Sequence, residues 1–163
     1  MALEKLIKGF IIDTGPLLLH AFYKFGGLEL VNPGIPMPDL NRVALLVERI
    51  FCSARKVVTT PYIIAEFHAI AERKAKLKGR KIVDFIRSYA EVLSKIEENI
   101  VQKEKILSFK AGWGLCFADS SLFLSAKELE MPILSVDREL VNFCKEKGID
   151  AFHVYYDVYL RFP

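Results

Sequence analysis

The chain has 163 residues, of which 52% are hydrophobic and 26% are charged, and its formal net charge is +3 at pH 7. These values are ordinary for one globular domain with a buried core, and so mild a charge does not by itself indicate a nucleic-acid partner. No apolar run approaches the ~18 residues that a membrane span requires. The apolar stretch near the start is interrupted by Asp13, and no small-residue cleavage site follows it. We expect a single domain over residues 1–163, a cytoplasmic location and no membrane partner.

The three cysteines, Cys52, Cys116 and Cys144, are widely spaced and form no CxxC pair. This spacing supports neither a zinc ribbon nor a disulfide framework. Two of the three lie in apolar periodic runs, which is typical of a cysteine that acts as a small buried hydrophobe.

In chain order, short apolar runs alternate with amphipathic segments. The apolar runs predict strands at residues 9–13, 56–60, 99–101, 132–136 and 151–155. The amphipathic segments predict helices at residues 17–25, 39–54, 61–77, 82–97, 103–113, 119–129 and 138–147. Asp39 is the expected N-cap of the second of these helices, and Thr60 followed by Pro61 is the expected start of the third. The alternation indicates an α/β fold with a mainly parallel sheet.

Four acidic residues stand out because each lies at the boundary of an apolar segment. Asp13 closes the first predicted strand, and Asp137 follows the fourth. Glu66 interrupts the apolar start of a helix, and Asp119 opens another helix after an apolar run. A carboxylate beside a core segment is costly to desolvate. Any one of them is more often a solvated turn residue, but four in this order indicate a site where a divalent metal ion offsets their repulsion.

The predicted topology brings these acids toward one edge of the sheet. In open parallel sheets, ligands bind beyond the carboxyl ends of the strands, where Asp13 and Asp137 lie. Glu66 falls in the second turn of the helix that follows a strand. Asp119 lies at a helix N-terminus, where the helix dipole favours a carboxylate. We therefore expect the four carboxylates to converge.

Carboxylates and hydroxyls select hard cations, so Mg²⁺ or Mn²⁺ is expected rather than zinc. The corresponding chemistry is phosphodiester hydrolysis by a metal-activated water. Hydroxyls that could orient a carboxylate, a metal-bound water or a phosphate stand beside the acids, at Thr14, Ser120, Ser121 and Ser135. Glu139 is either a fifth, peripheral acid of the site or a solvent-facing residue at a helix start.

Three segments in order, FIIDTGPLL, TTPYIIAEF and GLCFADSSLFLSAKELEMPILSVDREL, resemble a PIN domain, the metal-dependent ribonuclease family that includes VapC-type toxins. The resemblance covers nearly the whole chain. The four acids of the family match Asp13, Glu66, Asp119 and Asp137, and its Ser or Thr two residues before the last acid matches Ser135. The loop at residues 26–38 is longer than expected for a minimal toxin.

This resemblance implies a three-layer α/β/α sandwich, metal ligation and catalysis by the four acids, and endonucleolytic cleavage of RNA. It also implies homodimers and, if the protein is a toxin, a cognate antitoxin protein.

A basic run places six positive charges within nine residues, at Arg73, Lys74, Lys76, Lys78, Arg80 and Lys81. Such a run is about equally often a solvated helix end or a track for the phosphate backbone of RNA. Tyr62 and Trp113 are candidates to stack on unpaired bases, although each is more often a core aromatic.

Other enzyme classes fit the sequence poorly. The triplet from Asp13 to Gly15 mimics the aspartic-protease motif, but that fold is all-β. A haloacid-type phosphatase needs a second aspartate where Gly15 stands, and no glycine-rich nucleotide motif occurs. The leading hypothesis is a Mg²⁺- or Mn²⁺-dependent endoribonuclease, either a toxin or a general RNA-processing enzyme. A non-catalytic RNA-binding scaffold and a structure-specific DNA nuclease stay open as alternatives.

Overall fold

A computed structural model describes residues 2–110 and 114–161. Its centre is a five-stranded sheet in the order β3-β2-β1-β4-β5, and all four strand pairs are parallel. The strands are β1 (Phe10–Ile12), β2 (Val57–Thr59), β3 (Glu97–Glu98), β4 (Ile133–Ser135) and β5 (Ala151–His153). The predicted α/β class with a parallel sheet is confirmed.

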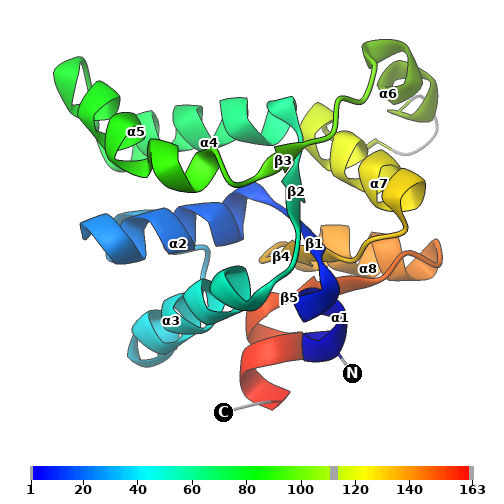
Figure 1. The fold of residues 1–163 in the computed structure, drawn as a ribbon, viewed down its shortest axis with the longest axis horizontal. Coiled ribbons are helices and arrows are strands. Elements are labelled where there is room, and N and C mark those ends of the chain that lie inside the picture. Colours follow the sequence, from blue (N-terminus) through cyan, green and yellow to red (C-terminus); the bar gives the residue numbers. More distant parts are fainter. Residues whose placement is uncertain (1, 111–113, 162–163) are drawn as a thin grey trace.

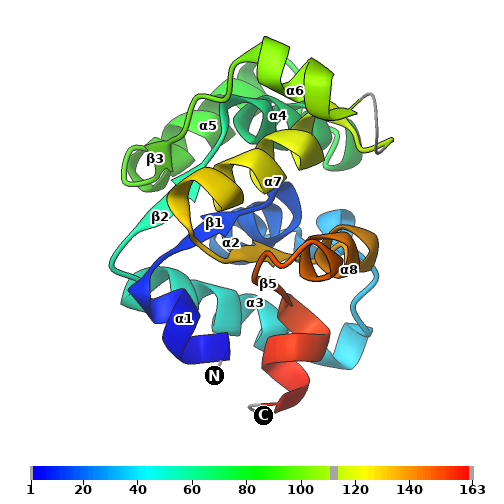
Figure 2. The ribbon, with the colours of Figure 1, turned by 90° about the vertical axis from the view of Figure 1, so that its right-hand side faces the viewer.

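Helices connect these strands and cover both faces of the sheet, which makes the fold a three-layer α/β/α sandwich. The α-helices are α1 (Ala2–Lys8), α2 (Thr14–Phe25), α3 (Met37–Ser53), α4 (Pro61–Lys74), α5 (Arg80–Leu93), α6 (Lys103–Lys110), α7 (Phe117–Leu129) and α8 (Arg138–Glu146). Helices α2 and α3 lie on one side of the sheet, and α7 and α8 lie on the other (Figure 1; Figure 2). Helix α4 packs against both α2 and α7, and so joins the two sides.

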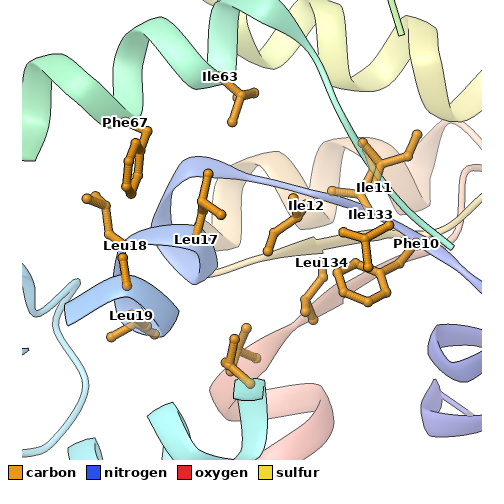
Figure 3. Packing of buried hydrophobic residues seen from close by; sticks show 14 of the residues in the cluster. Phe10, Ile11, Ile12, Leu17, Leu18, Leu19, Ile63, Phe67, Ile133 and Leu134 are labelled. Atoms are coloured by element: carbon orange, nitrogen blue, oxygen red, sulfur yellow. The ribbon is translucent and has the colours of Figure 1, made fainter. Parts of the chain in front are cut away.

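The core forms around the central strand because β1 is covered on both faces. Phe10, Ile11 and Ile12 are fully buried, as expected for a strand of a parallel sheet with helices on each side. Figure 3 shows them beside the apolar residues of α2, α4 and β4. Burial of each such side chain contributes about 1.5–3 kcal/mol. This packing fixes the carboxyl ends of β1 and β4 relative to each other.

The predicted strand at residues 99–101 is wrong. The edge strand is instead Glu97–Glu98, which pairs with Val58 and Thr59 of β2. Two exposed glutamates carry no apolar alternation, so no local pattern predicted this strand. The predicted helix at residues 82–97 ends at Leu93, which releases the two glutamates for pairing.

Asp39 is not the N-cap of α3, because the helix begins at Met37 with Pro36 as its cap. The Asp39 carboxylate instead accepts hydrogen bonds from the hydroxyls of Tyr155 and Tyr159, at 2.8 and 3.0 Å. These tyrosines belong to a π-helix (Val154–Val158) and a 3₁₀ turn (Tyr159–Arg161), and the strand predicted over residues 151–155 ends at His153. The aromatic end of the described chain is therefore fastened to α3.

Two further short helices were not predicted. Helix α1 occupies the apolar start of the chain, where only Leu6 is buried among its seven residues. The loop at residues 26–38 contains a 3₁₀ turn, Leu28–Val31, with Leu28 and Val31 buried. Within the two described ranges, no helix combines the length and apolarity needed to cross a lipid bilayer.

Candidate metal centre

Two of the four acids are fixed at the carboxyl ends of neighbouring strands. Asp13 follows β1 and caps α2, and its Oδ1 accepts a hydrogen bond from the Thr14 amide at 2.6 Å. Asp137 follows β4 and caps α8, and its Oδ1 accepts from the amides of Glu139 and Leu140 at 2.7 and 3.1 Å. Because β1 pairs with β4, these two caps lie at the same edge of the sheet.

The other two acids reach this edge from helices that pack against each other. Glu66 lies in the second turn of α4. Thr60 is the N-cap of this helix, as predicted, and its hydroxyl accepts a hydrogen bond from the Ile63 amide. The Thr60 hydroxyl also lies 2.7 Å from the Ser121 hydroxyl. Asp119 lies in the first turn of α7. Helices α4 and α7 are in contact, so the two carboxylates approach from the same direction.

All four acids line one open cavity of about 240 Å³, which we call the acidic cavity. Its wall also includes Thr14, Cys116 and Lys74, together with Leu18, Val31, Pro33 and Ile70. Val31 and Pro33 come from the long loop at residues 26–38, which therefore forms part of the site. Segments far apart in sequence are thus brought to one place.

The four carboxylates do not form a preassembled ligand cluster. In the part of the chain that the structure describes, no group of three or more His, Cys, Asp or Glu side chains is placed so that it could hold a metal ion. The acids share a cavity, but Asp13, Glu66 and Asp137 are held by amides and hydroxyls, and Asp119 is held by the thiol of Cys116.

The electrostatics of the acidic cavity nevertheless fit a cation. Burial raises the pKa of Asp13 to about 7, its two hydrogen bonds oppose this rise, and the charges of Asp119 and Glu66 add to it. Burial also raises the pKa of Asp119, and Asp137 and Glu66 contribute in the same direction. The carboxylates therefore repel one another. A divalent cation of the hard class would relieve this repulsion, and the oxygen donors are the kind it prefers.

Two of the predicted hydroxyls hold the acids in place. Ser135 donates to Oδ2 of Asp13 at 2.5 Å and accepts from the amide of Asp137 at 2.9 Å, so one side chain links two acids. Thr14 donates to Oε2 of Glu66 at 2.5 Å. Ser120, by contrast, is fully buried, and its hydroxyl has no hydrogen-bond partner among the described residues and does not line the acidic cavity.

Among the described residues of the basic run, only Lys74 lines the acidic cavity. Glu66, Ile70 and Lys74 are spaced four residues apart on α4, which places them on one face of the helix. The run then leaves the cavity, because α4 ends at Lys74 and α5 begins only at Arg80. The rest of the run is mostly exposed.

The sequence did not point to Cys116 as part of this site. Cys116 is exposed rather than buried, and it is the N-cap of α7, where its sulfur accepts from the amide of Asp119 at 3.3 Å. Partial desolvation of the sulfur raises the pKa of the thiol to about 11, so the thiol is protonated near neutral pH. The available signal was that Cys116 lies three residues before Asp119, where a helix was expected to start.

The remaining candidates lie apart from the acids. Tyr62 is half-buried and its ring centroid is 6.0 Å from that of Phe117. Glu139 is exposed, and it is not one of the described residues that line the acidic cavity. Trp113 lies outside the described residues.

Comparisons with known proteins do not assign this site. No protein-family model matches the chain, and no curated protein matches it. One similar solved structure is described as a domain of a functionally unknown protein from Methanocaldococcus jannaschii DSM 2661. It is 20% identical, with 90% of each chain covered and a TM-score of 0.48.

Proposed function

We propose that the protein is a Mg²⁺- or Mn²⁺-dependent endoribonuclease of the PIN-domain type. The observation that carries this proposal is that Asp13, Glu66, Asp119 and Asp137, from four separate segments, line one cavity at the carboxyl edge of a parallel sheet. The order and setting of these acids match the family that the sequence resembles.

The side chains of the acidic cavity would divide the work of phosphodiester hydrolysis. Ser135 and the Thr14 amide hold Asp13, and Thr14 also holds Glu66, so these two carboxylates are oriented before any ligand arrives. The Asp119 carboxylate is held by the thiol of Cys116, a weak donor, so a ligand would displace this contact at little cost. Lys74 places an ammonium group where it would meet the phosphate of a substrate. A bound Mg²⁺ or Mn²⁺ would lower the pKa of a water molecule, and its own charge would stabilise the phosphate.

The acidic cavity is open to solvent, so a flexible strand could lie across it. Single-stranded RNA, with one charge for each nucleotide, would reach it past Lys74, and we place this activity in the cytoplasm. A toxin role, an antitoxin partner and a homodimer rest on the family resemblance alone.

A second candidate function is a non-catalytic RNA-binding protein, and one specific observation favours it. In the described ranges the carboxylates are not assembled into a cluster ready for a metal ion. If that arrangement persists in solution with metal present, the acids would contribute no catalysis.

The test is cleavage of end-labelled single-stranded RNA by the purified protein with Mn²⁺, with EDTA, and with Asp119→Asn. We expect Mn²⁺-dependent cleavage that EDTA and Asp119→Asn abolish. The matched control is Asp150→Asn, an exposed carboxylate paired with Lys5 at 2.5 Å, which should cleave normally. Circular dichroism should show that both variants are folded.

Calorimetric titration with Mn²⁺ separates the two functions. Binding to the unaltered protein with loss in Asp119→Asn supports the nuclease. Cleavage that is equal in the unaltered protein and in Asp119→Asn points to a contaminating enzyme and removes the basis of the proposal.

A further inference from the structure

A second cavity, of about 400 Å³, lies apart from the acidic one. Its walls come from the far part of α2, the end of α3, the segment that leads into β2 and the end of α5, on the side of the sheet where α2 and α3 lie (Figure 1). Thr14 of α2 lines the acidic cavity and Lys24 lines this one, so about 15 Å of helix separates them. Among the described residues, the two cavities share no lining residue. We call this second space the basic cavity.

Positive charge is concentrated in the basic cavity. Its lining includes four cationic side chains and a single acidic one: Lys24, Arg55, Lys56, Lys95 and Glu97. Glu48 and Glu91 lie just outside this lining and pair with Lys24 and Lys95, so the four cations exceed the three nearby carboxylates by one charge. Such a concave, positively charged wall attracts anions and raises their local concentration.

These cations remain available to a ligand. The ammonium groups of Lys24, Lys56 and Lys95 each pair with one nearby carboxylate, at 3.1, 2.8 and 3.0 Å. Such partly exposed pairs contribute little stability, and each ammonium keeps further N–H donors. In the described part of the chain, the guanidinium of Arg55 has neither an ion-pair nor a hydrogen-bond partner. Arg55 therefore offers five unused donors in a fork that fits a phosphate.

A buried polar chain holds one wall of the basic cavity in place. His20 is 1% exposed, and its Nδ1 contacts the hydroxyl of Tyr89 while its Nε2 contacts Oε2 of Glu48. Burial lowers the pKa of His20, so the imidazole is neutral and links the other two groups without adding charge. The second oxygen of Glu48 then pairs with Lys24. The position of the Lys24 ammonium is thus set from the core.

The rest of the basic cavity is apolar. Phe51, Val57 and Val92 lie in its wall, and the ring of Phe51 is stacked on that of His20 at 4.5 Å between centroids. A cavity of this size falls within the range of small-ligand sites, which combine apolar walls with a few polar anchors. The polar anchors here are cationic side chains, which suit an anion. The apolar wall beside them suits a flat apolar group.

We propose that the basic cavity binds a mononucleotide, with its phosphate on Arg55 and the neighbouring lysines and its base against Phe51 and Val92. This inference does not depend on nuclease activity, because it involves a different cavity. It also requires no metal ion.

The test is isothermal titration of the full chain with AMP in EDTA, which removes any metal-dependent binding at the acidic cavity. We expect binding with a Kd below about 1 mM. Arg55→Glu should weaken it at least about tenfold, because the change removes charge-assisted hydrogen bonds to the phosphate and introduces a like charge. The matched control is Arg87→Glu, an exposed arginine of α5 outside the cavity, which should bind normally. Asp119→Asn should also bind normally.

Parallel titrations with adenosine and inorganic phosphate identify the ligand class. Each should bind at least about tenfold more weakly than AMP, because each satisfies only one part of the cavity. Absence of AMP binding, or equal affinity in Arg55→Glu and Arg87→Glu, overturns the proposal. Phosphate that binds as tightly as AMP overturns the assignment to a nucleotide.

Discussion

Replacing Asp13 by asparagine should remove part of the pH dependence of the stability of the metal-free protein. Burial raises the pKa of Asp13 from 3.8 to about 7. Because the folded-state pKa lies above the unfolded-state value, protonation of Asp13 favours the folded state. This stabilisation is fully present below pH 3.8 and is lost as the pH rises through about 7.

The size of the effect follows from the width of this window. At about 1.4 kcal/mol for each pKa unit, raising the pH from about 5.5 to about 8 withdraws about 2 kcal/mol of stability from the unaltered protein through Asp13. For a chain of this length, that corresponds to a fall in Tm of about 4–8 °C. Asparagine keeps an oxygen for the Thr14 amide and offers its NH₂ to Ser135, so Asp13→Asn should remain folded while losing this pH dependence.

The assay is urea unfolding in EDTA at the two pH values, for the unaltered protein, Asp13→Asn and the exposed control Asp150→Asn. The dependence of stability on pH in any one protein sums the titrations of several groups, since burial also raises the pKa of Asp119 and lowers the pKa values of His20 and His153. The difference between proteins isolates Asp13. Parallel profiles for the unaltered protein and Asp13→Asn would refute the reasoning, because they would mean that Asp13 is ionised across the whole range.

Three further predictions concern the carboxyl edge of the sheet, where the acidic cavity lies. Mn²⁺ at about 100 times its Kd should stabilise the unaltered protein by about 2.7 kcal/mol, and Asp119→Asn should lose this rise in Tm. Lys74→Met should lower RNA affinity and reduce the salt dependence of binding by about one phosphate contact, whereas Lys81→Met, outside the acidic cavity, should do less. Gly15→Ala should destabilise the fold by about 1–3 kcal/mol, because its Cβ would lie 2.1 Å from Cγ2 of Val136. Val136→Ala in the same chain should recover much of this loss.

Each of these has a decisive measurement. Thermal melts with and without Mn²⁺ test the first, and an equal rise in both proteins would contradict it. Binding titrations at several salt concentrations test the second, and identical slopes for the two lysine variants would count against it. A double-mutant cycle by urea unfolding tests the third, and strictly additive effects would show that the two side chains do not meet.

Sequence patterns predicted the parts of this fold that depend on local order. The acids at strand ends were found because Asp13 and Asp137 break apolar runs, and the parallel topology then brought them to one edge. The start of α4 was found because Thr60 and Pro61 form a cap that works through the nearest residues alone. Features that depend on distant partners were missed.

The missed features share a physical cause. The role of Asp39 depends on two tyrosines more than a hundred residues away, so its local pattern suggested only a helix cap. The strand β3 exists because β2 offers a free edge, and its own residues carry no strand signal. The local sequence around His20 does not indicate its contacts with Tyr89 and Glu48, because these partners come from two other helices. Such contacts are properties of the assembled fold.

The composition of β3 also has a consequence for how copies of this protein can associate. The strand presents only Glu97 and Glu98 at its edge of the sheet, and both side chains are exposed. A two-residue edge offers little backbone for a foreign strand, and its charged side chains disfavour pairing with an identical edge. At the opposite edge, β5 turns into the π-helix directly after His153. The short edge strand therefore disfavours extension of the sheet into fibres.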